Sequence, residues 1–186
     1  RNIQLHTYTY TDEVAATTAS VERLPDMVDY FSKNTGVPYP YETYSQVFVL
    51  DVPWGMAATS MAIQTENMVD DFGTHADFLY LWDGLEGESL AQQWFGNYVS
   101  CNDPNHIWLN KGFARYFSGL YNANKNGKDE FLLWQHAYDQ STYFFDWDYS
   151  VRQALVNTDT NNIYNFINSN TPYFHASAVM RMLHKE

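Results

Sequence analysis

The stretch GESLAQQWFGNYV, residues 87–99, carries the side chains whose types and spacing come closest to a catalytic pattern. Glu88 and Gln92 are four residues apart, so on a helix they lie on the same face. Two histidines at this spacing, with a glutamate after the first, bind zinc in metallopeptidases, and that glutamate is the general base. Here the five positions read Glu88, Ser89, Leu90, Ala91 and Gln92. The spacing indicates a metal-binding helix, but both histidines are absent.

A second block, WLNKGFARYFSGLY, begins at Trp108 and places Lys111 eighteen residues beyond Gln92, counting the intervening positions 93 to 110. Together the two blocks resemble the M1 family of zinc aminopeptidases, gluzincins in which H-E-x-x-H-Q-W-F-G-N precedes W-L-N-E-G-F-A at this separation. The matching residues are Gln93, Trp94, Phe95, Gly96 and Asn97, then Trp108, Leu109, Asn110, Gly112, Phe113 and Ala114. Upstream, YPYETYSQVFVLDVPWGMAA resembles the segment leading into G-x-M-E-N, and PYFHASAVMRML resembles the helix with the family's transition-state tyrosine.

The resemblance implies a role for each position of the site. The three zinc-ligand positions fall on Glu88, Gln92 and Lys111, the general base on Ser89, the amino-group anchors on Ala57 and Ala58, and the tyrosine on Tyr173. Only the tyrosine keeps its residue type. The family's M-E-N is not replaced by the later Thr65, Glu66 and Asn67, which come a few residues too late.

These substitutions predict a loss of peptidase chemistry. Catalytic zinc needs three His, Glu or Cys ligands and an open position. Gln92 is a weak neutral ligand, and the ammonium group of Lys111 has no lone pair and repels the ion. Ser89 is not a general base near neutral pH without an activating neighbour. We therefore expect no catalysis through Ser89 or Tyr173, no bound metal and no cofactor, although zinc serves the active family.

The changed residues still balance in charge. In the family the ligands and base contribute −2 and zinc +2, whereas here Glu88 contributes −1 and Lys111 +1. The hypothesis is that the Lys111 ammonium occupies roughly the zinc position and pairs with Glu88. At about 4 Å and an effective dielectric near 20 the gross attraction is roughly 4 kcal/mol, most of which desolvation offsets. Lys111→Ala is then expected to strand Glu88 and lower the melting temperature.

Two rival functions remain open at this point. The first is a metallohydrolase with a rearranged metal site, in which Glu88 acts with His106 or His175. The second is a peptide- or carbohydrate-binding module, with the aromatic segment STYFFDWDY (141–149) lining the cleft. The structural alternatives are a solvated helix face for Glu88 and Gln92, structural histidines, core packing for residues 141–149 and for Tyr173, and a solvated surface for the acidic set Asp70, Asp71, Asp77, Asp83 and Glu86.

The amino-acid composition argues against several classes of binding partner. The net charge is −12, from 22 acidic and 10 basic residues, so the basic stripe that nucleic-acid binding requires is missing, and an anionic membrane surface is disfavoured. No apolar run approaches the ~18 residues of a membrane helix. A single cysteine, Cys101, excludes an internal disulfide and a cysteine-based zinc site, and is read as a small buried hydrophobe. The expected partner is a peptide or protein in the cleft.

The pattern along the chain predicts one α+β domain over residues 1–186, a thermolysin-like M1 catalytic domain with a small mixed sheet followed by a mainly helical lobe. Strands are expected over 3–10, 45–52 and 58–65, and helices over 20–36, 74–82, 86–99, 106–122, 128–145 and 173–185. The chain reads as a fragment of a longer protein. By the resemblance, a β-domain precedes it and a helical domain follows it. The Asn- and Tyr-rich, Lys-poor composition favours an extracellular or periplasmic location.

Overall fold

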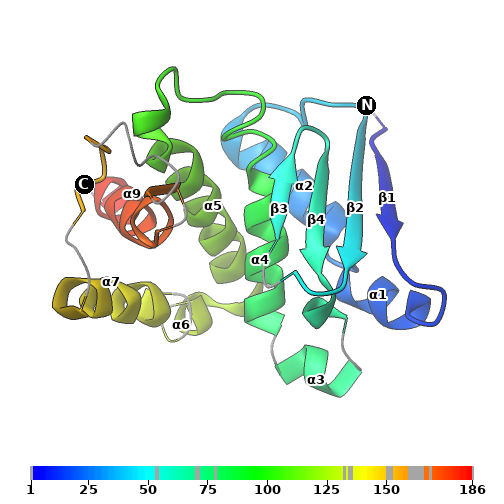
Figure 1. The fold of residues 1–186 in the computed structure, drawn as a ribbon. Helices are drawn as coiled ribbons and strands as arrows, with labels where there is room; N and C mark the ends of the chain where they lie inside the picture. Colours follow the sequence, from blue (N-terminus) through cyan, green and yellow to red (C-terminus); the bar gives the residue numbers. More distant parts are fainter. Residues whose placement is uncertain are drawn as a thin grey trace.

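A four-stranded mixed sheet forms one side of the molecule and a group of helices forms the other (Figure 1). The computed structural model describes residues 2–52, 55–69, 72–77, 79–131, 133, 136–149, 153–158, 166–167 and 169–185. This arrangement is the expected α+β fold of a small sheet followed by a helical lobe. No helix of the described residues is long and apolar enough to cross a bilayer.

The sheet has the strand order β1-β2-β4-β3. Its strands are β1 (Gln4–Tyr8), β2 (Thr43–Val49), β3 (Met56–Ala58) and β4 (Met61–Thr65). β2 pairs in parallel with β1 and with β4, whereas β3 pairs antiparallel with β4. The strands predicted over 3–10 and 45–52 correspond to β1 and β2, whereas the strand predicted over 58–65 is only partly confirmed, by β4. A turn at Ser60, whose φ is 57°, divides that stretch and makes β3 an edge strand.

Two N-terminal helices, α1 (Val14–Ser20) and α2 (Leu24–Thr35), connect β1 to β2. α2 confirms the helix expected within 20–36. Its apolar residues recur at helical spacing and are buried: Leu24, Met27, Val28 and Phe31. The helix ends at Gly36, whose φ of 70° is a left-handed conformation that glycine adopts without steric cost. Its buried face joins the hydrophobic core with Tyr44 of β2 and Leu90 and Trp94 of the 87–99 segment.

The helical lobe is built around two long helices, α4 (Leu79–Ala91) and α5 (Trp108–Asn126), which pack closely against each other. The helix expected over 86–99 is wrong in its extent, because α4 ends at Ala91. There the hydrogen bonds tighten: Gln93 N–H donates to Leu90 O and Trp94 N–H to Ala91 O. The motif residues after Gln92 therefore form a compact turn, in which Gly96 has a φ of 141°.

The remaining helices are shorter. They are α3 (Phe72–Asp77), α6 (Lys128–Phe131), α7 (Ala137–Tyr149) and α9 (Ala176–Lys185), with short helical turns η1 (Glu66–Met68), η2 (Pro104–His106) and η5 (Thr171–His175). In the described residues, the helix expected over 128–145 corresponds to α6 and α7. The helix expected over 173–185 begins with η5, a π-helical turn. α9 lies against α5 (Figure 1).

Candidate functional site

The edge strand is held beside α4 by one side chain of the 87–99 segment. The Gln93 amide nitrogen donates to Ala58 O at 3.0 Å and to Met61 O at 3.3 Å, and its oxygen accepts from Ser60 N–H at 2.8 Å. These bonds provide partners for three backbone groups at the turn between β3 and β4. They fix Ala57 and Ala58, the two expected anchor positions, along the edge strand next to α4.

Two further side chains of the motif blocks fix the loops around the site. The Trp94 indole N–H donates to Val37 O at 2.8 Å. Asn110 accepts from Cys101 N–H at 3.1 Å and donates to Ser100 Oγ at 3.0 Å. The free Cys101 is half-buried in this loop, rather than fully buried as its small apolar side chain suggests.

A close approach of α5 to the C-terminal helix brings Tyr173 to the site. A Cβ placed on Gly112 would lie 2.5 Å from the Ala176 Cβ, which is closer than carbon atoms pack. Glycine at this position therefore allows the two segments to touch. The π-helical turn that precedes Ala176 carries Tyr173 and Phe174, and both rings face cations of α5.

The three positions that the resemblance assigns to metal ligands lie together. Lys111 Nζ donates to Gln92 Oε1 at 2.7 Å and lies 5.2 Å from the centroid of the Tyr173 ring. Burial lowers the pKa of Lys111, and the nearby negative charge of Glu88 partly opposes that shift. Lys111, Gln92 and Glu88 are thus brought into one cluster, as the spacing predicts.

The partner expected for Glu88 is wrong. Its carboxylate forms an ion pair with Arg115 at 3.1 Å, while the direct hydrogen bond of Lys111 goes to Gln92. Arg115 also binds Asp139 of α7 at 2.6 Å, and its guanidinium lies 4.3 Å from the centroid of the Phe174 ring. Charge balance is therefore reached through an arginine, and Lys111 acts on Glu88 only across a longer distance.

Sequence reasoning missed Arg115 and Asp139. Arg115 follows Lys111 by four residues, so the two share a face of α5, and this spacing was a usable signal. No local signal points to Asp139, which is 2% exposed and comes to the site only through the packing of α7. Arg181 of α9 approaches the same carboxylate at 3.9 Å. Burial raises the pKa of Asp139, and Arg115 and Arg181 oppose that shift.

Neither expected catalytic position is activated. Burial, and then the negative charge of Glu88, raise the pKa of Tyr173 to about 12, so its phenol stays protonated at neutral pH. Ser89 is 3% exposed. Its hydroxyl would lie 2.8 Å from a Cβ on Gly55, and among the described residues no hydrogen bond joins it to a base. A serine without an adjacent base is a poor nucleophile and a poor general base.

The donor set does not fit a catalytic zinc ion. The Lys111 ammonium donates and offers no lone pair, Gln92 Oε1 is occupied by that ammonium, and Glu88 is bound by a guanidinium. His175 lies 3.5 Å from Asp146, and His106 is the last residue of η2. In the described ranges no three His, Cys, Asp or Glu side chains gather closely enough to hold a metal ion.

The acidic set and the aromatic segment differ from their structural interpretations. Asp70 and Asp71 lie outside the described residues, and Asp77 is exposed. A solvated surface is wrong for Asp83, which is buried and bound to Arg23 at 2.6 Å. It is also wrong for Glu86, which is 1% exposed.

Core packing is equally wrong for the described part of residues 141–149. Phe144 and Phe145 are more than half exposed. Tyr143 packs edge-on against His175, with ring centroids 4.6 Å apart.

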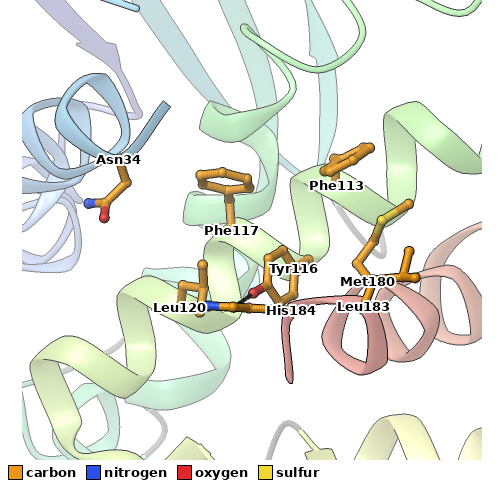
Figure 2. A pocket seen from close by; sticks show the side chains of 8 residues that line it. All are labelled: Asn34, Phe113, Tyr116, Phe117, Leu120, Met180, Leu183 and His184. Carbon is orange, nitrogen blue, oxygen red and sulfur yellow. Dashed lines mark hydrogen bonds between the residues drawn. The ribbon is translucent and has the colours of Figure 1, made fainter. Parts of the chain in front are cut away.

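A separate pocket of about 500 Å³ opens on another face of α5, between this helix and α9 (Figure 2). Its lining is mostly apolar and consists of Asn34, Phe113, Tyr116, Phe117, Leu120, Met180, Leu183 and His184. Figure 2 shows Tyr116 and His184 turned toward one another, and their Oη and Nδ1 atoms are joined by a hydrogen bond. With its polar pair already joined, this pocket offers fewer groups for chemistry than the Lys111 cluster.

Comparison with known proteins agrees with the fold and the motif blocks. The family model described as "Peptidase family M1 domain" matches residues 19–186. Aminopeptidase M1-A of Oryza sativa subsp. japonica is 28% identical over 158 residues, covering 82% of this chain and 18% of that protein. Transcription initiation factor TFIID subunit 2 of Drosophila melanogaster is 27% identical over 116 residues, covering 62% of this chain and 9% of that protein.

The solved structure of native leukotriene A4 hydrolase from Saccharomyces cerevisiae superposes with a TM-score of 0.75 at 19% identity, covering 96% of this chain and 28% of that one. This likeness shows the fold. The chain spans only 9% to 18% of the length of these two curated relatives.

Proposed function

The chain belongs to peptidase family M1, and on that premise we propose that it is a non-catalytic domain of the family, a pseudopeptidase. Its cleft binds or scaffolds a peptide or protein instead of hydrolysing it. No zinc or other cofactor takes part. In this proposal the flanking domains of a longer protein and the bound partner complete its function.

One observation carries the proposal: one of the three ligand positions is a lysine, and the other two are bonded to basic side chains. The Lys111 ammonium is bonded to Gln92, and the Arg115 guanidinium is bonded to Glu88. A divalent cation would have to enter beside two positive charges, and each lies within reach of the atoms it would need. At about 4 Å and an effective dielectric near 20, each unit charge would repel Zn²⁺ by roughly 8 kcal/mol, twice the unit-pair value.

The frame of the cleft supports a binding role. Gln93, Trp94 and Asn110 hold the edge strand and the surrounding loops in place around the site. One relative bears the name of a transcription initiation factor subunit and not that of a peptidase. That name is consistent with an M1 domain serving an assembly.

The deciding experiment measures zinc and hydrolysis on the same preparations. We expect purified protein, exchanged into buffer containing excess zinc and then desalted, to retain much less than one equivalent of zinc. We also expect no turnover of amino-acid amides. One equivalent of zinc, or turnover abolished by a chelator, would overturn the proposal in favour of a rearranged metal site.

A variant with restored ligands is the positive control. Glu88→His, Gln92→His and Lys111→Glu together return the family's ligand types to a frame that is still in place. We expect this triple variant to retain about one equivalent of zinc at neutral pH. Its uptake shows that the assay detects a site of this geometry.

A further inference from the structure

The single Asn–Gly pair of the sequence, Asn126–Gly127, lies where α5 ends. Asn126 is the last residue of the helix, and Gly127 follows it with a φ of 96°, which glycine adopts without steric cost. A Cβ placed on Gly127 would meet no atom within 4 Å. Because glycine has no side chain to obstruct the approach, its backbone nitrogen is well suited to attack the side-chain amide of the residue before it.

The side chain of Asn126 is held by Arg23, the residue at the N-cap of α2. The Arg23 guanidinium donates to Asn126 Oδ1 at 2.9 Å and to Asp83 Oδ2 at 2.6 Å. A guanidinium on an amide oxygen draws electron density from the carbonyl carbon and stabilises negative charge that develops on that oxygen. Arg23 therefore lies where an oxyanion donor is needed when Asn126 Cγ is attacked.

The leaving group and the nucleophile of this attack have no hydrogen bonds to give up. Asn126 Nδ2 is buried and has no hydrogen-bond partner in the part of the chain that the structure describes. Within the same residues, the Gly127 N–H donates no hydrogen bond. Helix termini open locally at little cost in free energy. The peptide after Asn126 can therefore rotate and bring the Gly127 nitrogen to the amide carbon.

We propose that Asn126 is a site of spontaneous deamidation, assisted by Arg23. The Gly127 nitrogen attacks Asn126 Cγ and forms a C–N bond. The Cγ–Nδ2 bond breaks, and ammonia leaves with the proton that the Gly127 nitrogen gives up. Water then opens the cyclic imide at either carbonyl, which leaves aspartate or isoaspartate at position 126. One water is consumed and one ammonia is released, without a change of oxidation state.

The reaction replaces a neutral acceptor of Arg23 with a carboxylate. One neutral side chain becomes an anion, so the net charge changes from −12 to −13. In the aspartate product the Arg23 guanidinium faces a carboxylate of α4 and another at the end of α5, and hydrogen bonds between ionised groups are roughly twice as strong as neutral ones. The modification thus changes the junction of α2, α4 and α5, fifteen residues along α5 from Lys111.

The test ages the purified protein in mildly alkaline buffer, digests it at acidic pH and maps the peptides by mass spectrometry. We expect the mass increase of an amide-to-acid exchange at Asn126, and a more negative species on ion exchange. Asn124 is an exposed residue of the same helix and is followed by Lys125, so it is the internal control. It should react at least about tenfold more slowly, because lysine has the Cβ that glycine lacks. An unmodified Asn126, or equal rates at the two residues, would overturn the proposal.

Two variants assign the roles of the side chains. Asn126→Gln keeps an amide beside Arg23 but requires a larger ring for the attack, so the more negative species should not form. Arg23→Gln removes the guanidinium and should slow the reaction at Asn126 about tenfold or more, since loss of one oxyanion donor typically costs an enzyme a larger factor.

Circular dichroism checks that each variant is folded, and Arg23→Lys replaces Arg23→Gln if the latter is not. An unchanged rate in the folded Arg23 variant would contradict the assistance by Arg23. The same charged species from Asn126→Gln would place the reaction at another asparagine and overturn the proposal. None of these outcomes depends on whether the domain binds zinc or hydrolyses a peptide.

Discussion

The frame of the site and its centre are built from the same two motif blocks, yet their side chains bond to different kinds of partner. In the frame, Gln93, Trp94 and Asn110 bond to backbone groups or loop side chains, and Gly112 lets α5 touch the C-terminal segment. At the centre, the Lys111 ammonium bonds to the side chain of Gln92, and the Glu88 carboxylate bonds to Arg115. The residues that hold the backbone in place are thus distinct from the residues that bond to one another at the centre, so the two sets can be tested separately.

The largest effect on stability is expected when the Arg115 guanidinium is removed from the centre of the site. Arg115→Met leaves Glu88 and Asp139 without their shared cation, and breaking such a buried network typically costs about 3–5 kcal/mol. We expect a loss of that size in the free energy of unfolding, measured by urea denaturation. Lys125→Met is the matched control, since its pair with Asp26 is much more exposed and such pairs contribute at most about 1 kcal/mol. Equal losses in the two variants would show that the centre is not a charge network.

The second test uses pH, through Glu86 behind the sheet. Burial raises the pKa of Glu86 to about 8; the hydrogen bond from Gln46 opposes this and the charge of Asp83 adds to it. The folded state therefore holds a proton that the unfolded state has released above about pH 4.5, so this contribution to stability is full below that pH and is lost as pH rises toward 8. We expect a decline on the order of a few kcal/mol across this window.

Glu86→Gln isolates the effect, because it keeps the shape of the neutral acid and cannot ionise. Its stability should lack that decline, as seen by comparing denaturation midpoints of the two proteins from pH 5 to pH 8. If the stabilities of the two proteins change in the same way with pH, the ionisation of Glu86 is not the cause of the decline.

A third test addresses the frame of the site, at Gly112. Gly112→Ala puts a Cβ 2.5 Å from Ala176, and overpacking of this kind costs about 1–3 kcal/mol. Gly84→Ala, in α4, meets no atom closer than 3.7 Å and should stabilise by up to about 1 kcal/mol through helix propensity. Thermal unfolding should show a lower stability for Gly112→Ala and a higher stability for Gly84→Ala. If both variants are destabilised, the close approach to Ala176 is not what sets the requirement for glycine at position 112.

The smallest effect is expected at Lys111 itself. Its removal does not strand Glu88, which keeps Arg115 at 3.1 Å, so Lys111→Met should change stability by less than about 1 kcal/mol or raise it, because a buried charge is removed. This revises the melting-temperature loss that a direct Lys111–Glu88 pair predicts. A large loss in thermal unfolding would restore that pair as the explanation.

The frame could be predicted from the sequence because its signals are local or belong to contiguous motif blocks. The apolar spacing of α2 and the β-branched run of β2 suffice for those elements. The end of α4 could not be predicted from spacing, because helical periodicity continues past Ala91 while Gly96 and the hydrogen bonds to Leu90 and Ala91 turn the chain.

The partners inside the site were harder to predict. The choice of Arg115 over Lys111 as partner of Glu88 depends on Asp139, which lies 24 residues from Arg115 in sequence and reaches it through the packing of α7. Helical spacing reports which residues share a face, but not which of two cations reaches a given carboxylate.

The π-helical turn at Thr171–His175 sets the rotational phase of everything that follows it. Successive residues of an α-helix differ by about 100° in direction, so deleting one residue from this turn would swing the α9 stripe containing Ala176 and Met180 away from α5. The same deletion would withdraw an aromatic ring from Lys111 or from Arg115. Deletion of a single residue from this turn would therefore change which α9 side chains line the pocket between α5 and α9, without altering α4 or α5 themselves.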